Sequence, residues 1–190
     1  MKAIILAGGV GRRMAPIQKD KCLLKFLGKE LILHQIAALE RAGIGEFIII
    51  CNPRSLEKVR ELVGGKAEYV VQEEAKGMAD ALLSITNPPK EALIVGASDL
   101  VEHGAYKDVL KKEGDSVLLG CKVKSYFPGG YLVTEDDKVR GVVEKPGAGN
   151  EPSDLVNIVV HLHRDFPRLV KSMRETNSGK DDVYERAMDR

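Results

Sequence analysis

The 190-residue sequence has no tryptophan, only three cysteines and no long hydrophobic run. Cys22, Cys51 and Cys121 are odd in number and far apart, so they offer neither a disulfide framework nor a Cys-x-x-Cys metal site. The apolar run at residues 3–7 is too short for the core of a signal peptide. No stretch approaches the roughly 20 apolar residues of a membrane span. We therefore expect a cytoplasmic protein that does not enter a membrane.

The sequence also lacks an excess of charge of one sign. It contains 29 Lys and Arg and 28 Asp and Glu, for a formal net charge of +1. A general binder of nucleic acid or of a membrane surface would have a basic footprint, so we expect neither partner. Hydrophobic residues make up 44% of the chain and charged residues 30%, which predicts one globular domain with an ordinary core.

Short apolar runs alternate with amphipathic segments over the first 125 residues. The runs predict buried strands, and the amphipathic segments predict helices. This alternation indicates an α/β fold, a Rossmann-like mixed and mainly parallel sheet with right-handed crossovers and helices on both faces. We expect strands at residues 3–7, 47–51, 67–71, 92–96 and 116–123, and helices at about 30–42, 55–63, 74–85 and 104–112.

The pattern changes after residue 125. Two short strand-like runs flank the turn EDDK at residues 135–138, which predicts a small β-hairpin. A further strand is expected at residues 155–163, where His161 and His163 share one face, with no third metal ligand close in sequence. Helices are expected at about 165–175 and from residue 181 onward.

The first predicted strand runs directly into a glycine-rich, cationic segment. A P-loop would require Gly-x-x-x-x-Gly-Lys-Ser/Thr, which is not present in the sequence. The dinucleotide fingerprint Gly-x-Gly-x-x-Gly fits Gly9 and Gly11 but meets Met14 at its third glycine. The segment after the second strand, residues 52–54, also lacks the acidic residue that would bind a ribose hydroxyl.

A third pattern fits. The segment LAGGVGRR at residues 6–13, followed by Pro16 and Lys21, resembles the signature of the sugar-1-phosphate nucleotidylyltransferases. This family includes glucose-1-phosphate thymidylyltransferases and mannose-1-phosphate guanylyltransferases. Glycines let a backbone approach a nucleotide closely, and cationic side chains neutralise its phosphates. The resemblance implies nucleotide-binding roles for Leu6, Ala7, Gly8, Gly9, Gly11, Arg13 and Lys21.

Two later segments match the same family in order. Gln72 and Gly77, in QEEAKGMADA, resemble the glutamine and glycine that recognise the base. Asp99 follows the strand ALIVG and resembles the aspartate that holds magnesium, although Ala97 and Ser98 stand where glycine is usual. Ligands of open α/β sheets also bind at this end of the parallel strands. The other interpretation of Asp99 is a cap for the next helix.

The remaining match concerns the acceptor. Gly130, the tripeptide Glu144-Lys145-Pro146 and Asn157 occur in the order of the family's sugar-phosphate site. The resemblance implies that Gly130 lies against the sugar and that Glu144 binds its hydroxyls. It further implies that Lys145 binds the phosphate and that Asn157 contacts the sugar.

Together these matches imply a nucleotidyltransferase that uses Mg²⁺, bound by Asp99. It would make an NDP-sugar and pyrophosphate from an NTP and a sugar 1-phosphate by in-line attack, without a protein nucleophile. The implied catalytic residues are Arg13, Lys21, Asp99 and Lys145. We expect one domain, 1–190, with a nucleotide-binding half at 1–125, a sugar-phosphate-binding half at 126–165 and C-terminal helices at 166–190.

Several alternatives stay open. Gln18 and Met78 replace threonines near the nucleotide, so no specific base follows from the resemblance. The sequence does not reveal the sugar either. The family's later Gly-x-x-Asp-x-Gly element, which supplies a second metal carboxylate, has no counterpart here. Either Asp181 or Asp182 substitutes, or one carboxylate suffices, or the chain is a fragment. The acceptor could instead be a molybdopterin, cobinamide or polyol phosphate, or the chain could be a non-catalytic, nucleotide-binding regulatory subunit. A homo-oligomer also stays open.

Overall fold

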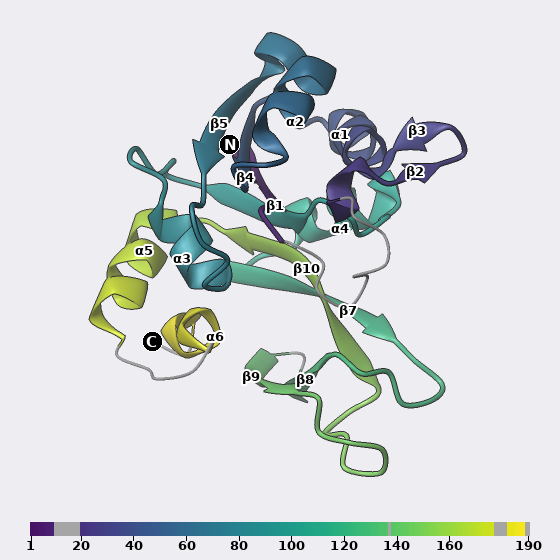
Figure 1. The fold of residues 1–190 in the computed structure, drawn as a ribbon. Coiled ribbons are helices and arrows are strands. Elements are labelled where there is room, and N and C mark those ends of the chain that lie inside the picture. Colours follow the sequence, from purple (N-terminus) through teal and green to yellow (C-terminus); the bar gives the residue numbers. More distant parts are fainter. Residues whose placement is uncertain (10–19, 137, 177–181, 189–190) are drawn as a thin grey trace.

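The computed structural model describes residues 1–9, 20–136, 138–176 and 182–188. Within these residues, eight strands form one mixed sheet in the order β5-β4-β1-β6-β10-β8-β9, with β7 also paired to β10 (Figure 1). The predicted fold class is confirmed: a mixed sheet, parallel at its centre, has helices on both faces and carries a small antiparallel hairpin. None of the helices in the described ranges is long and apolar enough to cross a membrane.

The parallel centre consists of β5 (Ala67–Val71), β4 (Phe47–Cys51), β1 (Lys2–Ala7) and β6 (Ala92–Gly96). β1 lies between β4 and β6, with its residue Ile5 opposite Ile49 on one side and Val95 on the other. These strands are short apolar runs because both faces of the sheet are covered. The strands predicted here from the sequence are confirmed.

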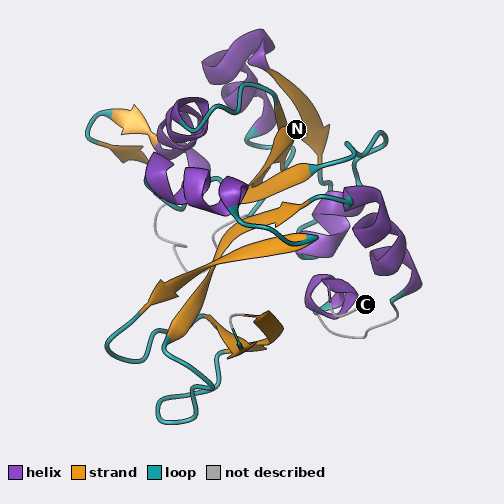
Figure 2. Ribbon diagram, turned by 180° about the vertical axis from the view of Figure 1, so that it is seen from behind, coloured by secondary structure: helices purple, strands orange, loops and turns teal. Residues whose placement is uncertain are grey.

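Six α-helices in the described residues cover the two faces of the sheet (Figures 1 and 2). One face packs against α1 (Leu31–Arg41), α2 (Leu56–Val63) and α4 (His103–Lys111). The other packs against α3 (Met78–Leu83), α5 (Phe166–Glu175) and α6 (Val183–Met188). Alternate residues of β1 point to opposite faces, so Ile5 belongs to the first core and Ile4 to the second.

The antiparallel part of the sheet is built on β10 (Leu155–His163). One end of β10 pairs with β6, where Val160 lies opposite Val95. The other end pairs with β8 (Gly130–Glu135), which forms the predicted hairpin with β9 (Lys138–Glu144). In Figure 1, β7 and β10 extend together from the sheet centre toward this hairpin.

The position predicted for one strand in the sheet is wrong. β7 (Ser116–Lys122) was expected to continue the parallel alternation, but it runs antiparallel to β10, with Ser116 opposite His163. The position beside β6 that a further parallel strand would take is filled by β10. The β-α alternation therefore ends at α4.

Smaller details of the local structure also differ from the prediction. α3 is a six-residue helix rather than the predicted helix over 74–85, and it begins after Gly77, whose φ is +97°. Ser55 precedes α2 but makes no side-chain capping hydrogen bond. Asn52 accepts from the N–H groups of Arg54 and Ser55 instead. The short hairpin of β2 (Lys25–Phe26) and β3 (Lys29–Glu30) was not predicted.

Candidate active site

A glycine follows one of the four parallel strands, and polar residues follow the other three, at the same edge of the sheet. Gly8 follows β1, Asn52 follows β4, Gln72 follows β5, and Asp99 lies three residues after the end of β6. Because the carboxyl ends of parallel strands meet at one edge, these four residues gather there. Together with the groups that bond to them, they form what we call the nucleotide cluster. This edge is the position at which open α/β sheets bind ligands.

Gly8 and Gln72 are in direct contact. A Cβ built on Gly8 would lie 2.9 Å from Gln72 Oε1, so no other residue fits this position without displacing the glutamine. The Gln72 side chain is buried, and its Nε2 donates to Gly77 O at 3.0 Å and to Asp80 Oδ2 at 2.8 Å. The structure thus brings together Gly8, Gln72 and Gly77, three of the residues predicted to bind the nucleotide.

The other residues predicted for the nucleotide have different surroundings. Gly9 is exposed, and a Cβ placed on it would meet nothing within 4 Å among the described residues. Leu6 and Ala7 belong to β1, where Leu6 O accepts from Ala97 N at 3.1 Å and so ties β1 to the segment before Asp99. Gly11 and Arg13 lie outside the described residues.

Asp20 and Asn52 form a buried polar contact that sequence reasoning missed. Asn52 Nδ2 donates to Asp20 Oδ1 at 2.8 Å, and Arg54 adds an ion pair to the same oxygen at 3.0 Å. Asn52 Nδ2 also lies 3.4 Å from Gly8 O. These bonds attach Asp20, which directly precedes Lys21, to the carboxyl end of β4. The available signal was a polar residue, Asn52, directly after the buried strand FIIIC.

The Asp99 carboxylate packs against the last residue of β6. A Cβ on Gly96 would lie 3.1 Å from Asp99 Cγ, so the glycine makes room for this carboxylate. Surrounding protein atoms desolvate the carboxylate and raise the pKa of Asp99, while the positive charge of Lys21 acts in the opposite direction. The side chain still has access to solvent. Asp99 does not cap α4, because the residue before that helix is Glu102.

The four residues predicted to bind the sugar phosphate lie together and form what we call the acceptor cluster: Gly130, Glu144, Lys145 and Asn157. A Cβ on Gly130 would lie 3.1 Å from Glu144 Oε2 and 3.8 Å from Asn157 Cβ. Lys145 Nζ pairs with Glu144 Oε1 at 2.6 Å, and both side chains are exposed. Lys145 has a φ of +44°, unusual for a residue with a side chain, and its N–H donates to Gly129 O at 3.0 Å.

Strand β10 connects the two clusters. It runs antiparallel to β6, with Val160 opposite Val95. Residues that precede Val160 in β10, including Asn157, therefore continue past the carboxyl end of β6, where Asp99 follows. The acceptor cluster and the nucleotide cluster consequently belong to the same edge of the parallel sheet.

The described residues contain no group of three or more His, Cys, Asp or Glu side chains that could hold a metal ion. Asp182, one of the carboxylates considered from the sequence, pairs with Arg186 in α6 at 2.8 Å. Asp181 lies outside the described residues.

The chain matches the nucleotidyl transferase family over residues 2–185. It belongs to this family. Among its relatives, the glucose-1-phosphate thymidylyltransferase of Xanthomonas campestris is 33% identical over 162 residues, which cover 76% of this chain and 54% of that protein. The catalytic subunit beta of mannose-1-phosphate guanylyltransferase from Dictyostelium discoideum is 30% identical over 162 residues, 77% of this chain and 45% of that protein.

Solved structures extend the likeness of this nucleotidyl transferase chain to the fold. A UDP-glucose pyrophosphorylase complexed with UDP-glucose superposes with a TM-score of 0.78 at 22% identity, covering 98% of this chain and 84% of that one. A structure described as a glucose-1-phosphate thymidylyltransferase from Bacillus anthracis gives a TM-score of 0.76 at 24% identity, covering 97% and 78%. The chain spans about half the length of the curated relatives named above.

Proposed function

We propose that this chain transfers a nucleotidyl group from an NTP to a sugar 1-phosphate, giving an NDP-sugar and pyrophosphate. The observation that carries the proposal is the pairing of two clusters at one sheet edge. Gly8, Gln72 and Asp99 lie at the carboxyl ends of the parallel strands, and β10 leads from there to Gly130 and Asn157.

In the nucleotide half, we assign the base to the surface formed by Gly8, Gln72 and Gly77. The Gln72 amide is held by two hydrogen bonds from its Nε2, so its orientation is set before a ligand binds. None of the described residues would meet a Cβ on Gly9 within 4 Å, which suits the close approach of a phosphate. Lys21 supplies positive charge near Asp99 and the triphosphate, and we assign the same role to Arg13.

In the acceptor half, we assign the sugar to Gly130, Glu144 and Asn157 and its phosphate to Lys145. Glu144 and Lys145 pair with each other at the surface, so Lys145 would exchange this exposed pair for the phosphate when the acceptor binds. An oxygen of the sugar phosphate then forms a bond to the α-phosphorus, while the bond from that phosphorus to the pyrophosphate oxygen breaks. No covalent bond to the protein is needed, and catalysis rests on alignment and charge neutralisation.

Magnesium is the cofactor that we propose, with Asp99 as its protein ligand. The carboxylate is a hard oxygen donor, it has access to solvent, and its pKa is raised by desolvation, so a nearby cation would favour its ionised form. When bound, Mg²⁺ would neutralise charge on the phosphates and on the leaving pyrophosphate.

We further propose that residues 1–125 and 126–165 act as the nucleotide and acceptor halves of one domain, with 166–190 as C-terminal helices. The partners would then be two small molecules, an NTP and a sugar 1-phosphate. A cytoplasmic location remains a prediction, as do the predictions that neither nucleic acid nor a membrane is a partner.

A substrate matrix tests the proposal. Each common NTP would be combined with several sugar 1-phosphates, and with a polyol phosphate as a different acceptor, in the presence of Mg²⁺. Pyrophosphate release with at least one sugar 1-phosphate, absent in an Asp99→Asn control, is the expected result. Release only with the polyol phosphate would assign another acceptor. Binding of NTP without release for any pair would favour the non-catalytic, regulatory interpretation.

A further inference from the structure

A chain of hydrogen-bonded side chains lies behind Asn157. His161 Nε2 is 2.9 Å from Asn157 Oδ1, and His161 Nδ1 is 2.8 Å from the hydroxyl of Tyr184 in α6. The same hydroxyl is 2.8 Å from His163 Nε2, and His163 Nδ1 is 2.8 Å from Ser116 Oγ. Both histidines and Tyr184 are at most 1% exposed. The chain therefore links the acceptor cluster to the packing of α6.

A bulge in β10 makes the first of these contacts possible. In a regular strand, two residues four positions apart are roughly 13 Å apart, too far for their side chains to meet. The pairing of β10 with β7 shifts between Ile158 and His161, which shortens the path from Asn157 to His161. The bulge thus places a histidine against a residue that regular geometry would keep away from it.

The order of donors and acceptors in this chain follows from its first member. An amide oxygen only accepts, so His161 Nε2 must carry a hydrogen and donate to Asn157 Oδ1. Burial lowers the pKa of His161 to about 3 and that of His163 to about 4, so each ring is neutral and carries one hydrogen. The Tyr184 hydroxyl then donates to His161 Nδ1 and accepts from His163 Nε2, and Ser116 donates to His163 Nδ1.

From this arrangement, and resting on the proposed function, we propose that His161 is a positioning residue for the acceptor. It holds Oδ1 of Asn157, so the Nδ2 group of the same amide is the end presented to an oxygen of the sugar 1-phosphate. Asn157 Nδ2 has no hydrogen-bond partner among the described residues, and Asn157 lies against Gly130 in the acceptor cluster. Tyr184 donates to Nδ1 of His161 and thereby connects α6 to the residue that orients Asn157.

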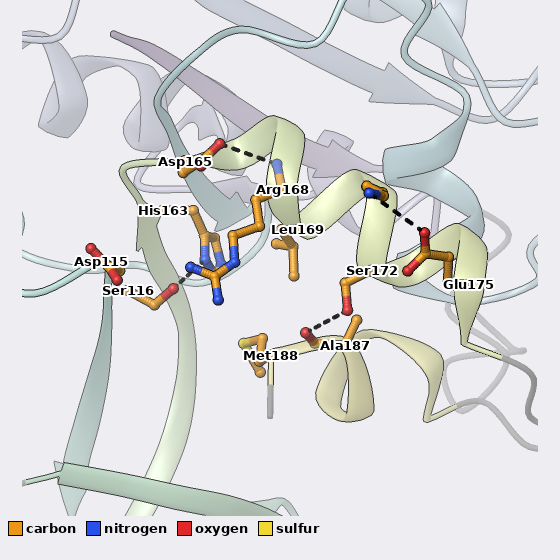
Figure 3. A pocket seen from close by; sticks show the side chains of 11 residues that line it. Asp115, Ser116, His163, Asp165, Arg168, Leu169, Ser172, Glu175, Ala187 and Met188 are labelled. Atoms are coloured by element: carbon orange, nitrogen blue, oxygen red, sulfur yellow. Dashed lines mark hydrogen bonds and ion pairs between the residues drawn. The ribbon is translucent and has the colours of Figure 1, made fainter. Parts of the chain in front are cut away.

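The outer end of the chain is visible in Figure 3. Ser116 and His163 line a pocket of about 420 Å³ bordered by residues of β7, β10, α5 and α6. None of the described residues that line this pocket belongs to the acceptor cluster. The outer end of the hydrogen-bond chain, Ser116 and His163, therefore lines a pocket that the acceptor cluster does not share.

Two variants of equal side-chain length test the role of His161. His161→Gln retains an N–H donor at the position of Nε2, whereas His161→Met has similar length and no donor. We expect His161→Met to lower kcat/KM for the sugar 1-phosphate about tenfold, with the KM for NTP unchanged. We expect His161→Gln to restore the value to within about threefold of the unmodified protein. Equal losses in both variants would overturn the proposal.

A double-mutant cycle separates positioning from a general structural effect. In an Asn157→Ala background, His161→Met should cause no further loss of kcat/KM, because the group that it positions is gone. A full tenfold loss in that background would overturn the proposal, since His161 would then act through something other than Asn157.

A measurement without variants or catalysis tests the same arrangement. Proton–nitrogen correlation spectra of the imidazole rings should show His161 with its hydrogen on Nε2 and none on Nδ1. A hydrogen on Nδ1 would overturn the proposal. This measurement does not depend on turnover. If the protein made no nucleotide sugar, the proposed function would be refuted, and the spectra would still show which nitrogen of His161 carries the hydrogen.

Discussion

The nucleotide cluster and the acceptor cluster lie at one sheet edge but are built differently. In the nucleotide cluster, three buried side chains make internal hydrogen bonds: Asp20 and Asn52 bond to each other, and Gln72 bonds to Gly77 O and to the half-buried Asp80. In the acceptor cluster, the charged pair Glu144–Lys145 is exposed. Only Asn157 in that cluster is backed by a buried network.

The difference follows from topology. The parallel strands are covered on both faces, so polar groups at their carboxyl ends are partly withdrawn from water and must find partners inside the protein. The hairpin of β8 and β9 attaches to the sheet through β10 and exposes the side chains at its end. The surface that we propose for the nucleotide is therefore held by internal hydrogen bonds, whereas the charged pair of the surface that we propose for the acceptor is exposed to solvent.

The largest effect is expected at Asp99. Asp99→Asn keeps the shape of the side chain and removes the charge that a divalent cation needs, so turnover should fall by orders of magnitude. The melting temperature should change little, because surrounding protein atoms desolvate the carboxylate and raise its pKa, so the ionised form is already disfavoured. Pyrophosphate release across a magnesium titration, together with a melting curve, measures both quantities. Full turnover at ordinary magnesium would remove Asp99 from the proposed mechanism.

The buried network behind the acceptor cluster should appear as a dependence of stability on pH. The pKa of His163 falls from 6.5 to about 4, so between these values the unfolded chain binds a proton that the folded chain does not. The free energy of unfolding should therefore rise with pH in this window. At about 1.4 kcal/mol per pH unit, the total is roughly 3 kcal/mol for this one group.

His161 contributes in the same direction, over a window that begins at about pH 3. Urea unfolding of the unmodified protein and of His163→Gln between pH 4 and 7 measures the effect, with the exposed His103→Gln as a control for the loss of a histidine. The slope should be shallower in His163→Gln. Identical slopes in the two proteins would show that His163 is not buried in its neutral form.

The features of the fold and the site that depend on nearby residues could be predicted from the sequence, whereas those that join distant segments could not. The parallel strands were predictable because each is a continuous apolar run, and Gly8, Gln72, Asp99 and Glu144 because they stand in a recognisable order. The direction of β7 was not predictable, because it depends on whether β6 pairs next with β7 or with the distant β10.

The hydrogen-bond networks were out of reach of the sequence for a related reason. Asp20 meets Asn52 only because two segments after different strands come together in space. His161 meets Asn157 only because a bulge interrupts the period of β10, whereas a regular strand predicts only that the two side chains share a face. The family resemblance concerned residues toward the substrates and carried no information about their support.

Replacing Lys21 or Lys145 by alanine tests whether the proposed nucleotide and acceptor halves bind their substrates separately. Lys21→Ala should lower kcat/KM for NTP by ten- to a hundredfold, about 1.5–3 kcal/mol, and leave the KM for the sugar 1-phosphate nearly unchanged. Lys145→Ala should do the reverse, and calorimetric titration with NTP alone should match the unmodified protein. Alanine keeps the Cβ at position 145, so the positive φ there is equally strained in both proteins. Weakened NTP binding in Lys145→Ala would show that the halves are not separate.

The smallest effects should distinguish buried from exposed partners of Asp20. Arg54 reaches Asp20 through a side chain that is 66% exposed, so Arg54→Ala should lower the free energy of unfolding by less than about 1 kcal/mol. Asn52 is buried, donates to the same carboxylate and accepts from two N–H groups before α2. Asn52→Ala should therefore lower the free energy of unfolding by roughly 2–3 kcal/mol.

Asn52→Asp retains the oxygen that accepts from the N–H groups before α2, but it places a second carboxylate against Asp20. This variant should therefore be less stable than the unmodified protein at neutral pH and recover stability as the pH falls toward 4. Urea unfolding of the three variants at pH 7 and pH 4 measures these differences. If Arg54→Ala and Asn52→Ala were equally destabilising, burial of the partner would not decide how much a contact with Asp20 contributes to stability.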